Sequence, residues 1–318
     1  MGKTQKIMKN EIDSIKGMNK SLDLLKNGNF TEALNNFSEL LKSNYSDSTI
    51  DSGIKCCKYW IPRVSKFEFM KDDSFKGKFI IDEWNKFESF ISSLKNMQEK
   101  VVSNTMFHIF NLALQAFKKD LNENRIIDFE TTLLIGITYK KIGDYRSSIS
   151  YFQDFLMNDS HNSNAMALLA DCYALIDEEK KSKILFREAF FNDALGIDIN
   201  LLESHIINTI TAKIEEFKIK KEDFTHWIPV FGRVYGIFNI YREILPVEYG
   251  KLKQEIFYLE NEQNKLGDEP FYIPRLLNCY LWLYDYHTLK NVKNSLEEVE
   301  EKIKNISPDL YDILKSNS

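Results

Sequence analysis

Two adjacent stretches of equal length repeat one pattern, and this period constrains the fold more than any other feature of the sequence. The first stretch reads FETTLLIGITYKKIGDYRSSISYFQDFLMNDSHN (129–162), and the second reads SNAMALLADCYALIDEEKKSKILFREAFFNDALG (163–196). The alignment needs no gap and pairs residues of the same type: Tyr139 with Tyr173, Ser148 with Ser182 and Phe152 with Phe186. A fixed period of this length indicates supersecondary units that stack on their neighbours.

Each copy is predicted to form two antiparallel helices joined by a tight turn. Small side chains at Gly136 and Ser148, and at Ala170 and Ser182, permit the close approach of two helices. Gly143 fits the turn, because glycine adopts positive φ without strain. The apolar residues after the turn recur at helical spacings: Tyr145, Ile149, Phe152 and Leu156.

A third copy lies near the N-terminus and reads SLDLLKNGNFTEALNNFSELLKSN. Gly28 and Phe30 take the places of Gly143 and Tyr145, although its first half departs from the pattern at Lys20. Together the three copies resemble the tetratricopeptide repeat, in which a large-small pair precedes a tyrosine and the second helix carries small-x3-Phe-x2-Ala. The resemblance covers about a third of the chain. It implies an all-α fold in which helical hairpins stack as a solenoid.

The remainder of the sequence is also predicted to be helical. Six prolines and twelve glycines are too few for the many tight turns of an all-β protein. Apolar residues recur at helical spacing in two further stretches: Ile80, Trp84, Phe87, Ile91 and Leu94, then Leu289, Val292, Leu296, Val299 and Ile303. The second stripe could pair within the chain or with a second copy, so self-association stays open.

Four regions are predicted from these patterns. They are an N-terminal hairpin region with one repeat-like unit (1–61), a loop with long helices (62–125), two repeats with a capping helix (126–222) and a divergent helical region (223–318). The loop is placed at KFEFMKDDSFKGK (66–78), and the capping helix at 197–220.

An aromatic-Ile-Pro motif occurs around Pro62, Pro229 and Pro274. Proline suits the first turn of a helix and pushes the preceding residue out of helical conformation. Each motif therefore predicts a helix start with a buried aromatic residue just before it. The alternative is that Trp60 and Trp227 are exposed anchors for a partner, because aromatic residues often dominate binding energy.

No local motif indicates catalysis, a cofactor or a metal. The net charge is −5 with both signs mixed along the chain, which lacks the basic footprint of a nucleic-acid binder. The four cysteines form no CxxC pair, the five histidines form no HxxxH pair, and neither GxSxG nor GxGxxG occurs. We expect a chain that is not an enzyme; a site assembled from distant residues is the alternative.

The family resemblance places a partner groove on the first helices of the repeats. Carried over by position, the groove residues are Glu130, Leu133, Ile137, Lys140, Asn164, Ala167, Asp171 and Ala174. Leu133, Ile137 and Leu168 stand where relatives that clasp a chaperone carboxylate have cations or amides, so that clamp is not expected. The groove suits an amphipathic helix or an extended segment. Alternatively, its apolar members pack against a neighbouring helix.

We therefore expect a non-catalytic scaffold or adaptor that binds a protein partner. A regulatory sensor that binds a peptide or small ligand is one alternative. The segments IPRLLNCYLWLYDYH and ISPDLYDIL also resemble repeat proteins of spirochaetes, some of which are scaffolds of the flagellar-motor collar, so a cell-envelope scaffold is another. The N-terminus has no signal-peptide core, and no apolar stretch approaches the ~18 residues of a membrane helix, so the cytoplasm is the expected location.

Overall fold

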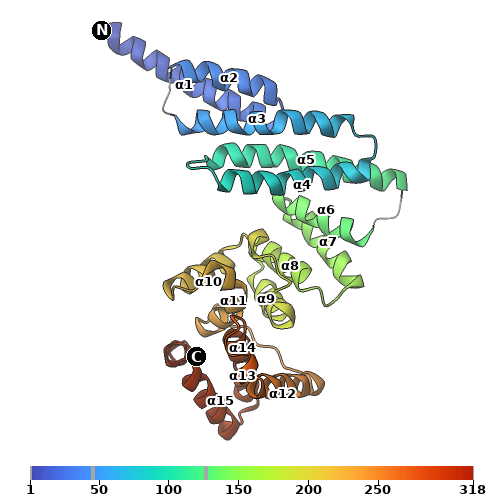
Figure 1. Ribbon diagram of the computed structural model, residues 1–318, viewed down its shortest axis with the longest axis vertical. Coiled ribbons are helices and arrows are strands. Elements are labelled where there is room, and N and C mark those ends of the chain that lie inside the picture. The colour runs from blue at the N-terminus through green and yellow to red at the C-terminus, as the bar shows by residue number, and fades with distance from the viewer. Residues whose placement is uncertain (1, 44–46, 125–127, 318) are drawn as a thin grey trace. The chain divides into compact units, whose positions relative to one another are not determined.

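The computed structural model describes residues 2–43, 47–124 and 128–317, and Figure 1 shows that its regular elements are helices. No strand occurs in those three ranges, so the predicted all-α class is confirmed. The chain divides into two compact units: unit 1 covers 1–148 and unit 2 covers 149–318. The division falls inside the third of the four predicted regions.

Unit 1 is built from long helices. They are α1 (Gly2–Lys26), α2 (Phe30–Ser43), α3 (Ser48–Phe69), α4 (Asp73–Ser92), α5 (Glu99–Asn124), α6 (Phe129–Lys141) and the first residues of α7 (Tyr145–Asn158). Helix α1 packs against α2 and α5, and α4 runs beside α5 (Figure 1). Each helix buries one apolar face, as the stripes in the sequence predict.

Aromatic rings fill the centre of unit 1. Trp60 of α3 and Trp84 of α4 are buried, and their rings stack with centroids 5.9 Å apart. The rings of Phe87 and Trp60 meet edge to face, with centroids 5.4 Å apart. At Gly53, an added Cβ would lie 2.4 Å from the ring of Phe37, so only glycine lets α2 and α3 approach this closely.

Unit 2 begins within α7 and consists of shorter elements. They are α8 (Ser163–Leu175), α9 (Glu179–Asp193), the 3-10 turn η1 (Ile199–Leu201), α10 (His205–Glu216), η2 (Lys221–Asp223), α11 (Phe224–Val234), α12 (Pro246–Asn261), α13 (Gln263–Leu266), α14 (Tyr272–Lys290), α15 (Lys293–Ile306) and α16 (Pro308–Ser316). Helix α14 is the most buried and packs on α11, α12 and α15. A non-helical segment, residues 235–245, joins α11 to α12; we call it the strap.

The two repeats have the same local structure. Helices α8 and α9 begin exactly one repeat period after α6 and α7. Asp128 caps α6 by accepting a hydrogen bond from the Thr131 amide, and Asn162 caps α8 in the same way. The turns match as well, since Gly143 has φ +85° and its counterpart in the second repeat, Asp177, has φ +63°. Gly28 has φ +80° in the N-terminal hairpin. Helices α1 and α2 pack as a hairpin in the N-terminal copy, and α8 and α9 do so in the second repeat.

Two of the three proline motifs do not start helices. Pro62 lies in the interior of α3, and Pro229 lies in the interior of α11. Burial of the flanking side chains, Trp60 and Ile228, holds these helices together across the hydrogen bond that a proline cannot donate. Pro274, the third residue of α14, is the one that stands at a helix start.

Three other boundaries differ from the prediction. Only residues 70–72 of the expected 66–78 loop lie outside helices. The expected capping helix at 197–220 is a 3-10 turn followed by α10, with a break at 202–204. The C-terminal apolar stripe is divided between α14 and α15 at Asn291, which has φ +57°. Val299 and Ile303 are buried on the side of α15 that packs within the chain, against α14 and α16.

Candidate functional site

The predicted groove positions of the second repeat are covered by the chain itself. Asp171 accepts hydrogen bonds from the amides of Glu203 (2.8 Å) and Ser204 (2.9 Å). Asn164 accepts another from the amide of Asp198 (3.1 Å). Ala167, Asp171 and Ala174 are buried. The groove assignment is thus corrected here, because residues 198–204 occupy the face that was expected to receive a partner.

The groove positions of the first repeat, all in unit 1, have mixed exposure. Glu130 is exposed and pairs with Lys78 of α4 at 3.0 Å. Leu133 and Ile137 are half-buried. Lys140 is 2% exposed, so its ammonium group is not available to a partner.

The two candidate aromatic anchors also differ from expectation. Trp60 is fully buried against Trp84, so its assignment as an exposed anchor is wrong. Trp227 is half-buried, and its ring meets the edge of Phe231 at 5.9 Å. Trp227 therefore presents only part of its surface to a partner.

The most developed concave surface of unit 2 consists of two adjoining cavities. The first cavity has a volume of about 420 Å³, and the second has a volume of about 270 Å³. Helices α9, α12 and α14 contribute residues to both. The strap adds Arg242 and Ile244 to the first cavity. The two cavities together are the candidate site.

The first cavity has an apolar floor beneath a charged rim. The apolar residues are Met166, Leu185, Phe191, Ile244, Leu252 and Trp282, and the charged residues are Glu188, Arg242, Glu248, Lys251, Glu255 and Arg275. An apolar cavity with a few fixed polar groups is typical of binding sites in general.

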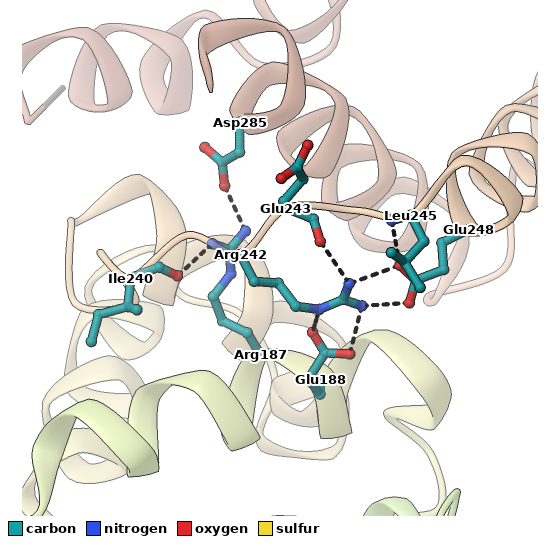
Figure 2. Close-up of polar contacts among 8 residues, drawn as sticks. All are labelled: Arg187, Glu188, Ile240, Arg242, Glu243, Leu245, Glu248 and Asp285. Carbon is teal, nitrogen blue, oxygen red and sulfur yellow. Dashed lines mark hydrogen bonds and ion pairs between the residues drawn. The ribbon is translucent and has the colours of Figure 1, made fainter. Parts of the chain in front are cut away.

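Arg242 is the most highly bonded residue of that rim, and Figure 2 shows its polar contacts. Its guanidinium lies between two carboxylates: Nη1 and Nη2 donate to Glu248 at 2.8 and 2.9 Å, while Nε and Nη2 donate to Glu188. The hydrogen bonds that Arg242 donates to Glu188 raise the pKa of Arg242 above its usual range. The hydrogen bonds that Arg242 donates to Glu248 outweigh burial and lower the pKa of Glu248. Every guanidinium nitrogen is engaged, so Arg242 is held rigidly, and its single positive charge faces two carboxylates.

The second cavity lies beyond Arg275 and is also mainly apolar. Its apolar lining residues are Ala194, Leu195, Tyr258, Leu259, Leu266 and Phe271. Leu195 and Tyr258 are 70% and 53% exposed, so the cavity opens onto an uncovered apolar rim. Burial lowers the pKa of His226 at its edge, which keeps this imidazole neutral near pH 7.

Three polar residues line both cavities and separate them: Asn192, Glu255 and Arg275. We call them the divider. Arg275 Nε donates to Glu255 at 3.1 Å, and Nη1 donates to the carbonyl of Phe191 at 2.5 Å. The exposed amide of Asn192 stands beside this pair. The divider therefore offers both donors and acceptors between two apolar spaces.

Buried charges hold the strap behind the first cavity. Arg187 donates to Asp285 at 2.5 Å and to the carbonyl of Ile240 in the strap at 3.0 Å (Figure 2). Arg233 donates to the other oxygen of Asp285 at 2.8 Å. The three side chains are at most 6% exposed. They fix the path of the strap and, with it, the position of Arg242.

Sequence reasoning missed this site because its residues come from separate elements with no common motif. The one local signal is Arg275, which directly follows the aromatic-Ile-Pro motif at Pro274.

The lengths of the helices and the grouping of side chains also bear on membrane insertion and metal binding. Throughout the described ranges, no helix is long and apolar enough to cross a membrane. In the same part of the chain, no three His, Cys, Asp or Glu side chains are grouped as metal ligands.

Comparison with known proteins adds no relative. No protein-family model matches the chain, and no curated protein matches its sequence. The resemblance to the tetratricopeptide repeat thus rests on the repeated residues and on the matching helix caps and turns.

Proposed function

We propose that this chain is a divergent tetratricopeptide-like scaffold of the cytoplasm, catalysing no reaction, which binds a segment of a partner protein. The binding surface is the pair of cavities in unit 2, in place of the repeat groove that the sequence favours. The observation that carries this proposal is the open, apolar double cavity with a rim already organised by Arg242 and Arg275.

Pre-organisation is the physical reason to regard this surface as a binding site. Arg242 and Arg275 keep their geometry through ion pairs with glutamates of α9 and α12. A partner therefore meets ordered groups, and binding loses less side-chain entropy. The uncovered rim at Leu195 and Tyr258 adds apolar surface of the kind found at interfaces.

A sensor for a small ligand is the second candidate. The first cavity has a volume of about 420 Å³, within the range of small-molecule sites. Its lining contains the half-buried ring of Phe191, which can stack on a flat ligand. Under this alternative, the low-molecular-weight fraction of a native cell extract raises the melting temperature of the purified chain.

Site-specific photo-cross-linking tests the scaffold proposal. The photoreactive residue benzoylphenylalanine replaces Leu195 at the rim of the second cavity, and a matched control carries it at Glu297, which is exposed on α15. After irradiation in native cell lysate, we expect a discrete cross-linked protein from the Leu195 position that the Glu297 position does not yield. Equal patterns from both positions, or none from either, would contradict the proposed surface.

A further inference from the structure

The polar groups of the divider favour one conformation of a bound segment over others. Arg275 uses Nε and Nη1 within the unit, and its Nη2 donates no hydrogen bond among the residues that the structure describes. The exposed amide of Asn192 offers a further donor and acceptor at the same point. A ligand that crosses from one cavity to the other must pass these groups.

A bound helix does not suit this arrangement. The main-chain groups of a helix are hydrogen-bonded internally, so a helix lying over Arg275 and Asn192 would remove water from them and replace none of its hydrogen bonds. An extended segment presents free N–H and C=O groups along its length and can bond to both. It also places bulky side chains into successive spaces on one face.

The rims differ in charge. Lys251 is exposed at the first cavity, and Asp193 is exposed at the second. Around the first cavity the charges cancel, because three cations (Arg242, Lys251 and Arg275) face three carboxylates (Glu188, Glu248 and Glu255). Around the second cavity two carboxylates, Asp193 and Glu255, face one cation, Arg275, which leaves Asp193 as the group that a ligand charge would sense. A charge at one end only gives a bound segment a preferred direction.

From these features we infer that the double cavity binds an extended peptide segment with two bulky apolar side chains, one in each cavity. The uncharged main chain between them bonds to Asn192 and Arg275. A basic residue flanks the side chain in the second cavity, near Asp193. This inference rests on the proposed function and specifies the partner.

Selection of peptides by the purified full-length chain tests the inference. A displayed library of random peptides is enriched on the chain, and the best peptide is synthesised with a fluorescent label for anisotropy titrations. We expect two bulky apolar residues in it, and replacement of either by alanine to weaken binding about tenfold or more. Peptides with a single apolar residue, or with apolar residues at helical i, i+4 spacing, overturn the inference.

Variants of the chain test the divider and the rims. Asn192→Ala is expected to weaken the peptide severalfold, whereas the matched control Asn294→Ala, exposed on α15, leaves binding unchanged. Asp193→Lys is expected to weaken the peptide by about twofold to fivefold at low salt, and exchange of the basic flank for glutamate restores it. Equal affinity of Asn192→Ala and Asn294→Ala contradicts the role of the divider.

The outcomes separate the inference from the proposed function. If the probe at Leu195 cross-links a partner but the library yields no extended peptide, the inference is wrong and the scaffold function stands. If neither experiment yields a binder, both are wrong. If the selected peptide also blocks the cross-link at Leu195, both are supported.

Discussion

The two units bury different chemistry at their centres. In unit 1 the space is filled by rings, with Trp60 stacked on Trp84 and Phe87 at their edges. In unit 2 two arginines and one carboxylate, Arg187, Arg233 and Asp285, are almost completely buried. Both sets of side chains are shielded from water, but the second set consists of charged groups that depend on their pairing.

The difference shows what each centre can specify. Apolar packing has little directional preference. It therefore stabilises a compact core without selecting one particular path for a loop. A buried charge must have its partner in place, because an unpaired one is very unfavourable. In unit 2 this requirement fixes a non-helical strap against α9 and α14, and the strap carries Arg242 to the cavity rim.

Removal of the central carboxylate is the strongest test of this contrast. Asp285→Ala leaves two buried guanidinium groups without their counter-ion, and we expect a loss of ~3–5 kcal/mol in the free energy of unfolding. The counterpart in unit 1 is Trp84→Ala, with an expected loss of ~3–5 kcal/mol from the lost apolar burial and the cavity left behind. Urea titration followed by circular dichroism measures both.

Cysteine labelling assigns each loss to its unit. Burial raises the pKa of Cys56 in unit 1 and of Cys279 in unit 2 to about 12, so both thiols are protected in the folded chain. We expect Asp285→Ala to speed the labelling of Cys279 more than that of Cys56, and Trp84→Ala to do the reverse. Equal acceleration at both thiols in both variants would show that the units do not open separately.

The next test compares two different residues that occupy the same position in the two repeats. Ile137 in the first repeat corresponds to Asp171 in the second, and only Asp171 holds backbone amides. Asp171→Ala leaves the amides of Glu203 and Ser204 without their acceptor, and we expect a loss of ~1–3 kcal/mol. Hydrogen exchange at those two amides should accelerate, while exchange at the capped amide of Thr131 in unit 1 serves as the control and stays unchanged.

The turns of the two repeats provide a smaller contrast. Gly143→Ala places a side chain at φ +85° in open space, so only the backbone conformation is penalised, by ~1–2 kcal/mol. Asp177 already has φ +63°, and Asp177→Gly should relieve strain and stabilise the chain by less than ~1 kcal/mol. Melting temperatures that shift in the same direction for both variants would contradict the equivalence of the turns.

The smallest expected effect is a dependence on pH between 7 and 5. Burial lowers the pKa of His108 in unit 1 and of His287 in unit 2. The unfolded chain then binds protons more readily, so each histidine's contribution is present above pH ~6.5 and is lost as the pH falls through the folded-state pKa. His108→Gln should reduce this decline as measured by Cys56 labelling, and leave the decline measured by Cys279 labelling unchanged.

Local structure was predictable wherever short-range physics decides it. The helix starts one repeat period apart, the α8–α9 hairpin and the positive φ at Gly143 follow from spacing and residue type, and all are present. The proline motifs misled because burial of Trp60 and Ile228 overrides the local preference of proline for a helix start. The groove positions misled because exposure depends on what covers a face, and residues 198–204 do so here.

The sequence by itself determined the all-α class and the positions of the repeated helices and turns, because helix periodicity and turn geometry depend on residues a few positions apart. Only the tertiary structure decided which faces are covered and where a cavity forms. Arg187 pairs with Asp285, and Arg242 pairs with Glu188, although the partners are far apart in the sequence. Such pairings depend on the packing of whole helices, which no local pattern encodes.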